Sequence, residues 1–335
     1  MYRSSSIERS PMNYHSDTSA PYNGASPMVS VVIPARNAAA TLAETLRSLQ
    51  QQDFDAWEAV VVDDGSTDDT AAITHQFSVN DGRIRCIPGP KRGVSAARNA
   101  GIHRSVGAFV AFLDADDLWL PHKLRTHMDY MTQHPQVGIT FDRVLFVNVH
   151  GHSTGVFSTQ RVSNLPPHAF IYENPACTAS TLVVRRTALV QCGAFDELMK
   201  WSEDLEFMVR MRCTTAWGVQ GLDDVMTYYR ASPTGASASL ESMQAGWEHL
   251  IIRVKSYAPE LVAKHYRPAR AVHLRYLARR ALRVGAPASL GLRLFGQALA
   301  SSPLALMREP RRTLGTLGGL CAQGVIEHLP RTQRN

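Results

Sequence analysis

The chain lacks the features that mark several large classes of protein. Its 335 residues hold no uncharged, mostly apolar stretch of about 18 residues, so we expect no membrane-spanning helix. Its five cysteines are far apart and form no CxxC pair, which argues against a zinc site or a disulfide framework and favours a reducing compartment. The patterns GxxxxGKS/T and GxGxxG are also missing, so the two commonest phosphate-binding loops are excluded.

Acidic residues are scarce in the last part of the chain. Residues 241–335 contain 15 Lys/Arg against 5 Asp/Glu, a net charge of +10, whereas the first 240 residues hold 20 basic and 24 acidic residues. We expect the acidic part to carry carboxylate chemistry and the basic part to face an anionic partner or solvent. No aromatic-interleaved motif accompanies the basic charge, so nucleic acid is not an expected partner.

These contrasts predict three segments. Residues 1–27 are polar and lack the apolar core of a secretory signal, so we expect a disordered tail and a cytoplasmic protein. Residues 28–235 are expected to form an α/β domain. Residues 236–335 are rich in Ala, Leu and Arg and are expected to form a basic helical C-terminal region.

Strand and helix patterns alternate along the first half of the α/β domain. The predicted strands, short apolar runs rich in β-branched residues, cover residues 28–34, 57–62, 83–87 and 108–113. Thr41 and Glu44 match a capping box at the start of a predicted helix. The alternation predicts right-handed βαβ units and a mostly parallel sheet flanked by helices.

Polar clusters follow three of the predicted strands. They are Pro34–Asn37, Asp63–Ser66 and Asp114–Asp117. In a parallel sheet the carboxyl ends of the strands share one edge, where ligands bind. Asp114 and Asp116 alternate in an extended segment, so both can face one ligand, and such oxygens suit a Mg²⁺ or Mn²⁺ ion that shares its shell with phosphates. Helix capping and turn formation are the alternative for these acids.

Five blocks of sequence occur together in a characteristic order. They are VSVVIPARNAAATLAETLRSL, VVVDDGSTDDT, GVSAARNAG, FVAFLDADD and SEDLEFMVRM. In order and spacing they resemble the family 2 glycosyltransferases, which have the A-type glycosyltransferase fold with a Rossmann-like nucleotide-binding half. The resemblance covers about Met28 to Arg230 and implies that residues 28–235 form the catalytic domain.

The resemblance implies a binding site for a nucleotide-sugar donor. Its first block points to Pro34, Ala35 and Asn37 as donor-binding residues. The second block points to Asp64, which would accept a hydrogen bond from the base, and to Gly65, which allows close backbone approach. For Asp64 the alternative is helix capping.

The third and fourth blocks imply the diphosphate side of the donor site. Arg98 is expected near the nucleotide, although an isolated helical arginine more often faces solvent. Asp114 and Ala115 are expected to contact the donor, and Asp116, together with Asp114, to bind Mn²⁺ or Mg²⁺. Asp117 is expected to cap the following helix.

The last block implies the catalytic base. Asp204 is expected to take the proton of the attacking hydroxyl, and a single base opposite the leaving group implies inversion at the anomeric carbon. Glu203 is expected to orient the acceptor, and Trp201 either to stack on a sugar or to pack in the core. For both acids the alternative is capping of a helix N-terminus.

Two further features leave alternatives open. Many family members carry a histidine where this chain has Ser232, which puts the third metal ligand in doubt and directs attention to the histidines of residues 150–168. The segment Ala271–Arg283 places leucines and alanines on one helical face and three arginines on the other. Such a helix either lies on an anionic membrane or docks its leucines on the catalytic domain and leaves its arginines in water.

The sequence therefore predicts a metal-dependent, inverting glycosyltransferase. A UDP- or dTDP-linked donor and a sugar or lipid-linked acceptor are expected, in surface polysaccharide or glycolipid assembly. The enzyme is expected in the cytoplasm, either free or peripheral on the inner face of the cell membrane. A catalytically silent nucleotide-sugar-binding module is the alternative. A nucleotidyltransferase is less favoured, because the chain has no GxGxR loop after the first strand.

Overall fold

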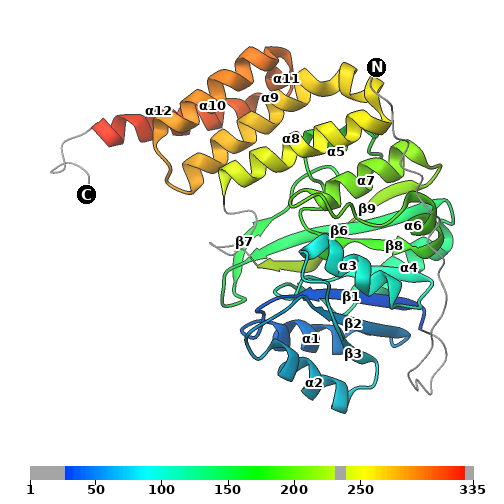
Figure 1. Cartoon of the computed structure of the whole chain (residues 1–335). Coiled ribbons are helices and arrows are strands. Elements are labelled where there is room, and N and C mark those ends of the chain that lie inside the picture. Colours follow the sequence, from blue (N-terminus) through cyan, green and yellow to red (C-terminus); the bar gives the residue numbers. More distant parts are fainter. Residues whose placement is uncertain (1–26, 231–238, 329–335) are drawn as a thin grey trace, which may run out of the picture.

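A computed structural model describes residues 27–230 and 239–328, and the described strands form one sheet (Figure 1). The strands are β1 (Val29–Ala35), β2 (Trp57–Asp63), β3 (Ile84–Pro88), β4 (Phe109–Phe112), β5 (Leu118–Trp119), β6 (Val137–Val147), β7 (Ser153–Phe157), β8 (Val183–Arg185) and β9 (Gly218–Arg230). Their order is β3-β2-β1-β4-β8-β6-β9-β5, with β7 paired to β6.

The sheet has a parallel half and a mixed half. The pairs β3–β2, β2–β1 and β1–β4 are parallel, as the alternating pattern predicts. Beyond β4 the strand β8 runs antiparallel to both of its neighbours, and only β6 and β9 pair in parallel. The α/β class with flanking helices is confirmed, but the sheet as a whole is mixed because its second half is not built from βαβ units.

Helices cover both faces of the sheet and extend the fold beyond it (Figure 1). Those of the α/β part are α1 (Leu42–Gln50), α2 (Thr70–Asn80), α3 (Val94–His103), α4 (Lys123–Gln133), α5 (Ala169–Tyr172), α6 (Arg186–Cys192) and α7 (Glu203–Thr214). The C-terminal helices are α8 (Leu240–Tyr257), α9 (Pro259–Arg283), α10 (Ala288–Ser301), α11 (Pro303–Met307) and α12 (Pro310–His328).

The hydrophobic core runs from the sheet into the C-terminal helices. One cluster joins buried residues of the strands and α7, such as Phe207, to Trp247 and Leu250 of α8 and Ala269 of α9. A second cluster fills the space between the parallel strands, α1 and α4. The predicted boundary at residue 235 falls between the two described segments, and the helices after it share the core before it.

A polar cluster is fully buried where α4 packs on β6. Lys123 forms an ion pair with Asp142, and His127 lies 3.3 Å from the same carboxylate. Burial and the nearby Lys123 charge lower the pKa of His127 to about 4, so the ring is neutral at physiological pH. The pairing compensates two buried charges and fixes α4 on the sheet.

The structure differs from two local predictions. Thr41 precedes α1 but makes no side-chain capping bond, because its hydroxyl donates to the carbonyl of Ala115, while Glu44 forms an ion pair with Arg230. The two side chains of the predicted capping box therefore connect α1 to the loop that contains Ala115 and to the end of β9. In α9 Arg275 is buried in an ion pair with Glu309, so it does not lie on a solvent-facing basic side.

The apolar face predicted for Ala271–Arg283 is used inside the protein. Its leucines and alanines are buried against α10, α11 and α12. The face therefore docks inside the protein, but on the other C-terminal helices rather than on the catalytic domain as the docking alternative had it, and its leucines and alanines are not available to a membrane. Among the described helices, none is both long and apolar enough to cross a bilayer.

Candidate active site

The loops after β1 and β2 are held together at the carboxyl edge of the sheet. Asn37 has a left-handed backbone (φ 51°), and its side-chain oxygen accepts a hydrogen bond from the Thr67 amide at 2.8 Å. The Asn37 amide in turn donates to the Ser66 hydroxyl at 3.0 Å. Pro34 and Ala35 end β1 directly beneath this loop pair. The predicted donor-binding loops thus lie side by side.

Asp64 organises the loop that follows β3. Its carboxylate is buried and accepts from the backbone amides of Lys91 at 2.6 Å and Gly93 at 3.0 Å. Gly65 has φ 86°, and an added Cβ would meet the Lys91 side chain at 3.0 Å. The backbone here needs glycine because of this conformation, and the structure adds a loop-holding role for Asp64. Close approach of Gly65 to a nucleotide stays a prediction. The contact of Asp64 with a base also stays a prediction.

Asp114 is fixed from two sides. Its Oδ1 accepts from Arg98 Nη2 at 2.7 Å, and its Oδ2 accepts from the Thr178 hydroxyl at 3.3 Å. The Asp114 amide donates to the Ser180 hydroxyl at 3.0 Å. Residues 178–180 come from the irregular region before β8 and act as a support for the aspartate pair.

Asp116 lies beside Asp114 on a loop whose backbone carbonyls accept hydrogen bonds from other parts of the fold. The Ala115 carbonyl accepts from Thr41 at 2.8 Å, and the Asp116 carbonyl accepts from Arg230 Nε at 2.8 Å. Burial and the Asp114 charge raise the pKa of Asp116 to about 6. A cation at this position would relieve both causes.

Asp117 is not a helix cap, contrary to the prediction. It is fully buried, accepts from the Ser180 hydroxyl at 2.6 Å and from the Arg230 amide at 2.9 Å, and lies six residues before α4 begins. The side chain therefore joins the aspartate loop to the end of β9, a role that needs a buried acceptor rather than a helix terminus.

Arg98 connects the aspartate pair to the acidic pair that begins α7. This arginine of α3 is buried, and its Nη1 donates to Glu203 at 2.6 Å while Nη2 donates to Asp114. Although burial opposes the charge, the two carboxylates raise the pKa of Arg98 above its usual value, so it stays cationic. Three sequence blocks thus meet at one guanidinium. Both of its Nη atoms are bonded to carboxylates, so direct contact with a diphosphate stays a prediction.

Asp204 has the surroundings of a proton acceptor. It is 8% exposed, its Oδ2 accepts from Asn174 at 2.8 Å, and its Oδ1 accepts from the Leu205 amide at 2.8 Å. Burial and the Glu203 charge raise the pKa of Asp204 to about 6. A carboxylate with that pKa is ionised at neutral pH but more basic than an exposed aspartate, which suits general-base catalysis.

The turn before α7 is strained and closely covered. Ser202 has φ 60°, a left-handed conformation that costs a non-glycine residue about 1–2 kcal/mol. Half-buried Trp201 lies under α8, where a Cβ added to Gly246 would come within 2.8 Å of the Trp201 Cβ. The C-terminal helices therefore help to hold the residues that precede Asp204. Stacking of Trp201 on a sugar stays a prediction.

The aspartate pair fits a divalent cation that takes its other ligands from a substrate. Within residues 27–230 and 239–328 no three His, Cys, Asp or Glu side chains come together, so this part of the chain offers the pair Asp114 and Asp116 rather than a larger cluster. Mg²⁺ and Mn²⁺ commonly bind one or two carboxylates and complete their shell with phosphates and water. His168, from the segment considered for a third ligand, stacks instead on His265 at 4.1 Å. Ser232 lies outside the described residues.

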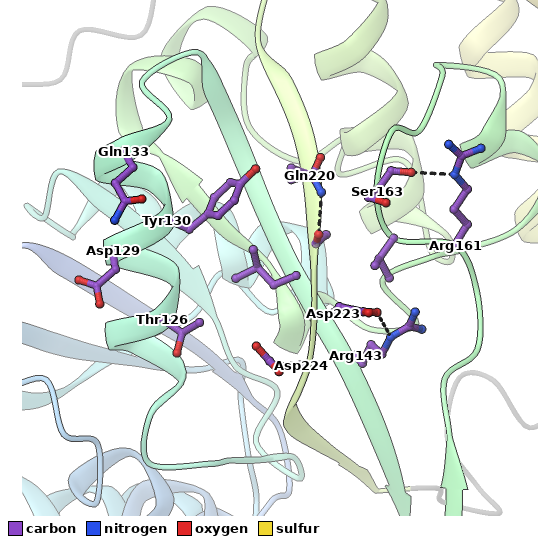
Figure 2. A pocket seen from close by; sticks show the side chains of 13 residues that line it. Thr126, Asp129, Tyr130, Gln133, Arg143, Arg161, Ser163, Gln220, Asp223 and Asp224 are labelled. Carbon is purple, nitrogen blue, oxygen red and sulfur yellow. Dashed lines mark hydrogen bonds and ion pairs between the residues drawn. The ribbon is translucent and has the colours of Figure 1, made fainter.

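A separate hollow of about 680 Å³ opens between α4, β9 and the loop at residues 161–163. Figure 2 shows Tyr130 and Gln133 of α4 on one side and Arg161 on the other, with the strand carrying Gln220 between them. None of the predicted site residues lines this hollow, so it is not part of the aspartate site. The candidate active site is built from the rim of loops described above.

The sheet, its loop rim and the two acidic pairs define an A-type glycosyltransferase fold. Solved structures agree with this: the mannosyltransferase PcManGT from Pyrobaculum calidifontis, in complex with GDP-Man and Mn²⁺, matches with a TM-score of 0.57 at 18% identity, over 93% of this chain and 92% of that one. The S. aureus TarS 1–349 structure with UDP-GlcNAc matches with a TM-score of 0.54 at 20% identity, over 87% and 92%. These likenesses show the fold.

Residues 30–193, just under half of the chain, match the family model described as glycosyl transferase family 2, and the resemblance to this family is confirmed. Two Escherichia coli relatives are UDP-Glc:alpha-D-GlcNAc-diphosphoundecaprenol beta-1,3-glucosyltransferases. WfgD is 35% identical over 31% of this chain and 41% of its own length. WfaP is 29% identical over 71% of this chain and 95% of its own length. The match to WfgD, like that to the putative teichuronic acid biosynthesis glycosyltransferase TuaG of Bacillus subtilis, covers less than half of the relative's length.

Several residues that shape the site are not identified by its sequence blocks. Asn174, Thr178 and Ser180 support the two acidic pairs from the irregular region before β8, where neither spacing nor residue type signals a role. Arg230 could have been noticed, because it ends the last strand of the domain with a charged residue. Its fourfold bonding to Glu44, Asp116, Asp117 and Val149 shows only in three dimensions.

Proposed function

We propose that the protein is an inverting glycosyltransferase that moves a sugar from a nucleoside diphosphate donor to a hydroxyl acceptor. The observation that carries this proposal is the bridge from Asp114 through Arg98 to Glu203, which joins the aspartate pair, proposed here to bind a cation, to the acidic pair that contains Asp204. Displacement at the anomeric carbon needs charge stabilisation on the leaving side and a proton acceptor on the attacking side. The bridge brings groups of both kinds to one site.

Asp204 takes the proton of the acceptor hydroxyl in this proposal. Asn174 and the α7 backbone hold its carboxylate by one hydrogen bond to each oxygen, and the pKa of about 6 keeps it ionised at neutral pH. Glu203 is bonded to Arg98 and acts as a positioning residue beside it. With one base facing the attack, the product has the opposite anomeric configuration.

Asp116 and Asp114 would hold Mn²⁺ or Mg²⁺ together with the donor diphosphate. When bound, the cation neutralises charge that develops on the departing nucleoside diphosphate. Pro34, Ala35 and Asn37, on the adjoining loop, are proposed to bind the nucleotide. Asp64 and Gly65 shape the neighbouring loop for the base, and Ala115 presents its backbone to the donor between the two metal-binding aspartates.

The donor is proposed to be UDP- or dTDP-linked, and the acceptor a sugar or lipid-linked hydroxyl in surface polysaccharide or glycolipid assembly. Support comes from relatives named for transfer from UDP-Glc to a diphosphoundecaprenol-linked sugar and from the TarS complex with UDP-GlcNAc. A catalytically silent binding module is less favoured, because such a module has no need for a buried, basic carboxylate at Asp204.

A transfer assay on the full chain tests the proposal. Nucleotide sugars are first screened by thermal shift with Mn²⁺ present, since a ligand that binds the folded state raises the melting temperature. The best donor is then incubated with acceptor alcohols, and the anomeric configuration of the product is read by NMR. Inversion is expected. Retention of configuration, or donor binding with no transfer to any acceptor and no hydrolysis, would reject the mechanism.

A further inference from the structure

The last helix exposes an apolar side to solvent. Along α12, exposed Leu314, Gly318, Ala322 and Val325 recur at intervals of three or four residues, which places them on one side of a helix. Leu314 is 66% exposed and Val325 is 64% exposed. The α12 face is defined here as the exposed residues Leu314, Gly315, Gly318, Cys321, Ala322, Val325 and Ile326. It contains no charged side chain.

The opposite side of α12 already packs inside the protein. Leu320 is buried against Gly291 of α10, and Leu282 of α9 lies against Gly319. Gln323 donates to the Ala286 carbonyl at 2.7 Å. The α12 face is therefore not the side that docks the helix, and α12 lies at the margin of the molecule, beyond α9 and α10 (Figure 1). The face is a second apolar side, available to a partner.

The charges around the α12 face indicate what that partner is. Exposed Arg308 and Arg311 flank its N-terminal end, and exposed Leu304 and Met307 of α11 adjoin them. From Leu261 to Arg308 the chain has nine Lys/Arg and no Asp/Glu. Glu309, the next acid, forms ion pairs with Arg275 and Arg312. An apolar stripe with basic residues beside it is the composition of helices that lie in the surface of an anionic bilayer.

We propose that the α12 face binds an anionic membrane surface, with α12 lying along the surface and Arg308 and Arg311 contacting lipid phosphates. A second copy of the chain fits less well, because its α12 face would offer no acidic side chain to pair with Arg308 and Arg311. The proposal rests on the proposed function in one respect: a lipid-linked acceptor would lie in the surface to which the helix binds.

Co-sedimentation of the full chain with vesicles tests this surface without any sugar donor. We expect binding to vesicles of phosphatidylcholine mixed with phosphatidylglycerol, little binding to phosphatidylcholine alone, and weaker binding at high salt. Replacing Arg308 and Arg311 by Gln should weaken binding roughly fivefold for each arginine. Leu314→Ser with Val325→Ser should weaken it at least about tenfold.

The matched control is the pair Val79→Ser and Val106→Ser, which removes two exposed valines from the catalytic domain and should leave vesicle binding unchanged. Failure of the wild type to bind anionic vesicles at low salt, or equal binding by the Leu314→Ser/Val325→Ser variant, overturns the proposal. So does a dimer in analytical ultracentrifugation that this variant dissociates. If vesicles bind but no glycosyl transfer occurs, the surface stands and the proposed function falls.

Discussion

Replacing Asp204 by asparagine should make the protein more stable while it removes activity. Ionisation of the buried carboxyl is unfavourable, and its pKa moves from 3.8 to about 6. At about 1.36 kcal/mol for each pKa unit, the ionised form costs roughly 3 kcal/mol at neutral pH. Asparagine carries no charge but meets the Asn174 amide less well, so we expect about half of that as net stabilisation.

The difference in stability between Asp204→Asn and the wild type should change with pH. Below about pH 4 the Asp204 carboxyl is largely protonated in both folded and unfolded states, so only the poorer fit of asparagine to Asn174 remains, and Asp204→Asn should be about 1.5 kcal/mol less stable than the wild type. As the pH rises towards 6 the unfolded chain loses this proton first, and the wild type loses stability that the variant keeps. Above pH 6 the variant should be about 1.5 kcal/mol more stable, a rise of about 3 °C in Tm.

Thermal unfolding across pH 4–8 measures this difference, with Asp129→Asn as control because Asp129 is exposed and should show none. In the same preparations, kcat should fall by about 10²–10⁴ in Asp204→Asn, and wild-type kcat/KM should rise with pH to a plateau above about 6. A variant that is less stable than the wild type at pH 8, or that turns over at the wild-type rate, refutes the reasoning.

Three other substitutions probe the rest of the site, and a fourth probes the buried ion pair between α4 and β6. Asp116→Ala should abolish the Mn²⁺-dependent part of the increase in melting temperature that the donor causes. The metal assignment is contradicted if the variant shows the same increase as the wild type, or if the full wild-type increase persists when a chelator removes the metal. Arg98→Lys should lower kcat roughly 10–100-fold with little change in donor KM, because an ammonium cannot span two carboxylates as the planar guanidinium does; a change confined to KM would argue against a positioning role. Gly246→Val should reduce kcat roughly tenfold, because the larger side chain crowds and displaces the turn before α7. Gly296→Val is the control: Gly296 has open space around it, so kcat should be unchanged. Lys123→Met should destabilise the fold by about 3–5 kcal/mol in denaturant titration, since it leaves a buried carboxylate unpaired; a loss below 1 kcal/mol would show that this ion pair contributes little.

The parallel half of the fold could be predicted because its sequence is locally consistent. The strands β1 to β4 are short apolar runs separated by helices of ordinary spacing, and each ends in the polar cluster that marks the rim. The mixed half gives weaker signals. The strand β8 has three residues, and only its pairing between β4 and β6 makes it part of the sheet.

The same contrast holds for the candidate site. Asp114, Asp116 and Asp204 lie in sequence blocks whose order made them candidate site residues. In the structure, Arg98 connects the aspartate pair to the acidic pair that begins α7. The local interpretation of Thr41 failed because a capping pattern and a tertiary tether use the same residue types. Such hydrogen bonds depend on which carbonyl, distant in sequence, lies near the side chain in the fold. A local sequence pattern does not contain that information.

Because α8 and α9 share a hydrophobic core with α7, segments cannot be exchanged freely between this chain and related proteins. Phe207 and Trp247 belong to one continuous cluster, although the segment that matches the family ends at residue 193. A chimera joined between the two described segments would set foreign side chains against the helix that carries Asp204. Exchange of whole blocks is therefore expected to disturb turnover even where every motif is kept, whereas grafting single rim loops leaves this packing intact.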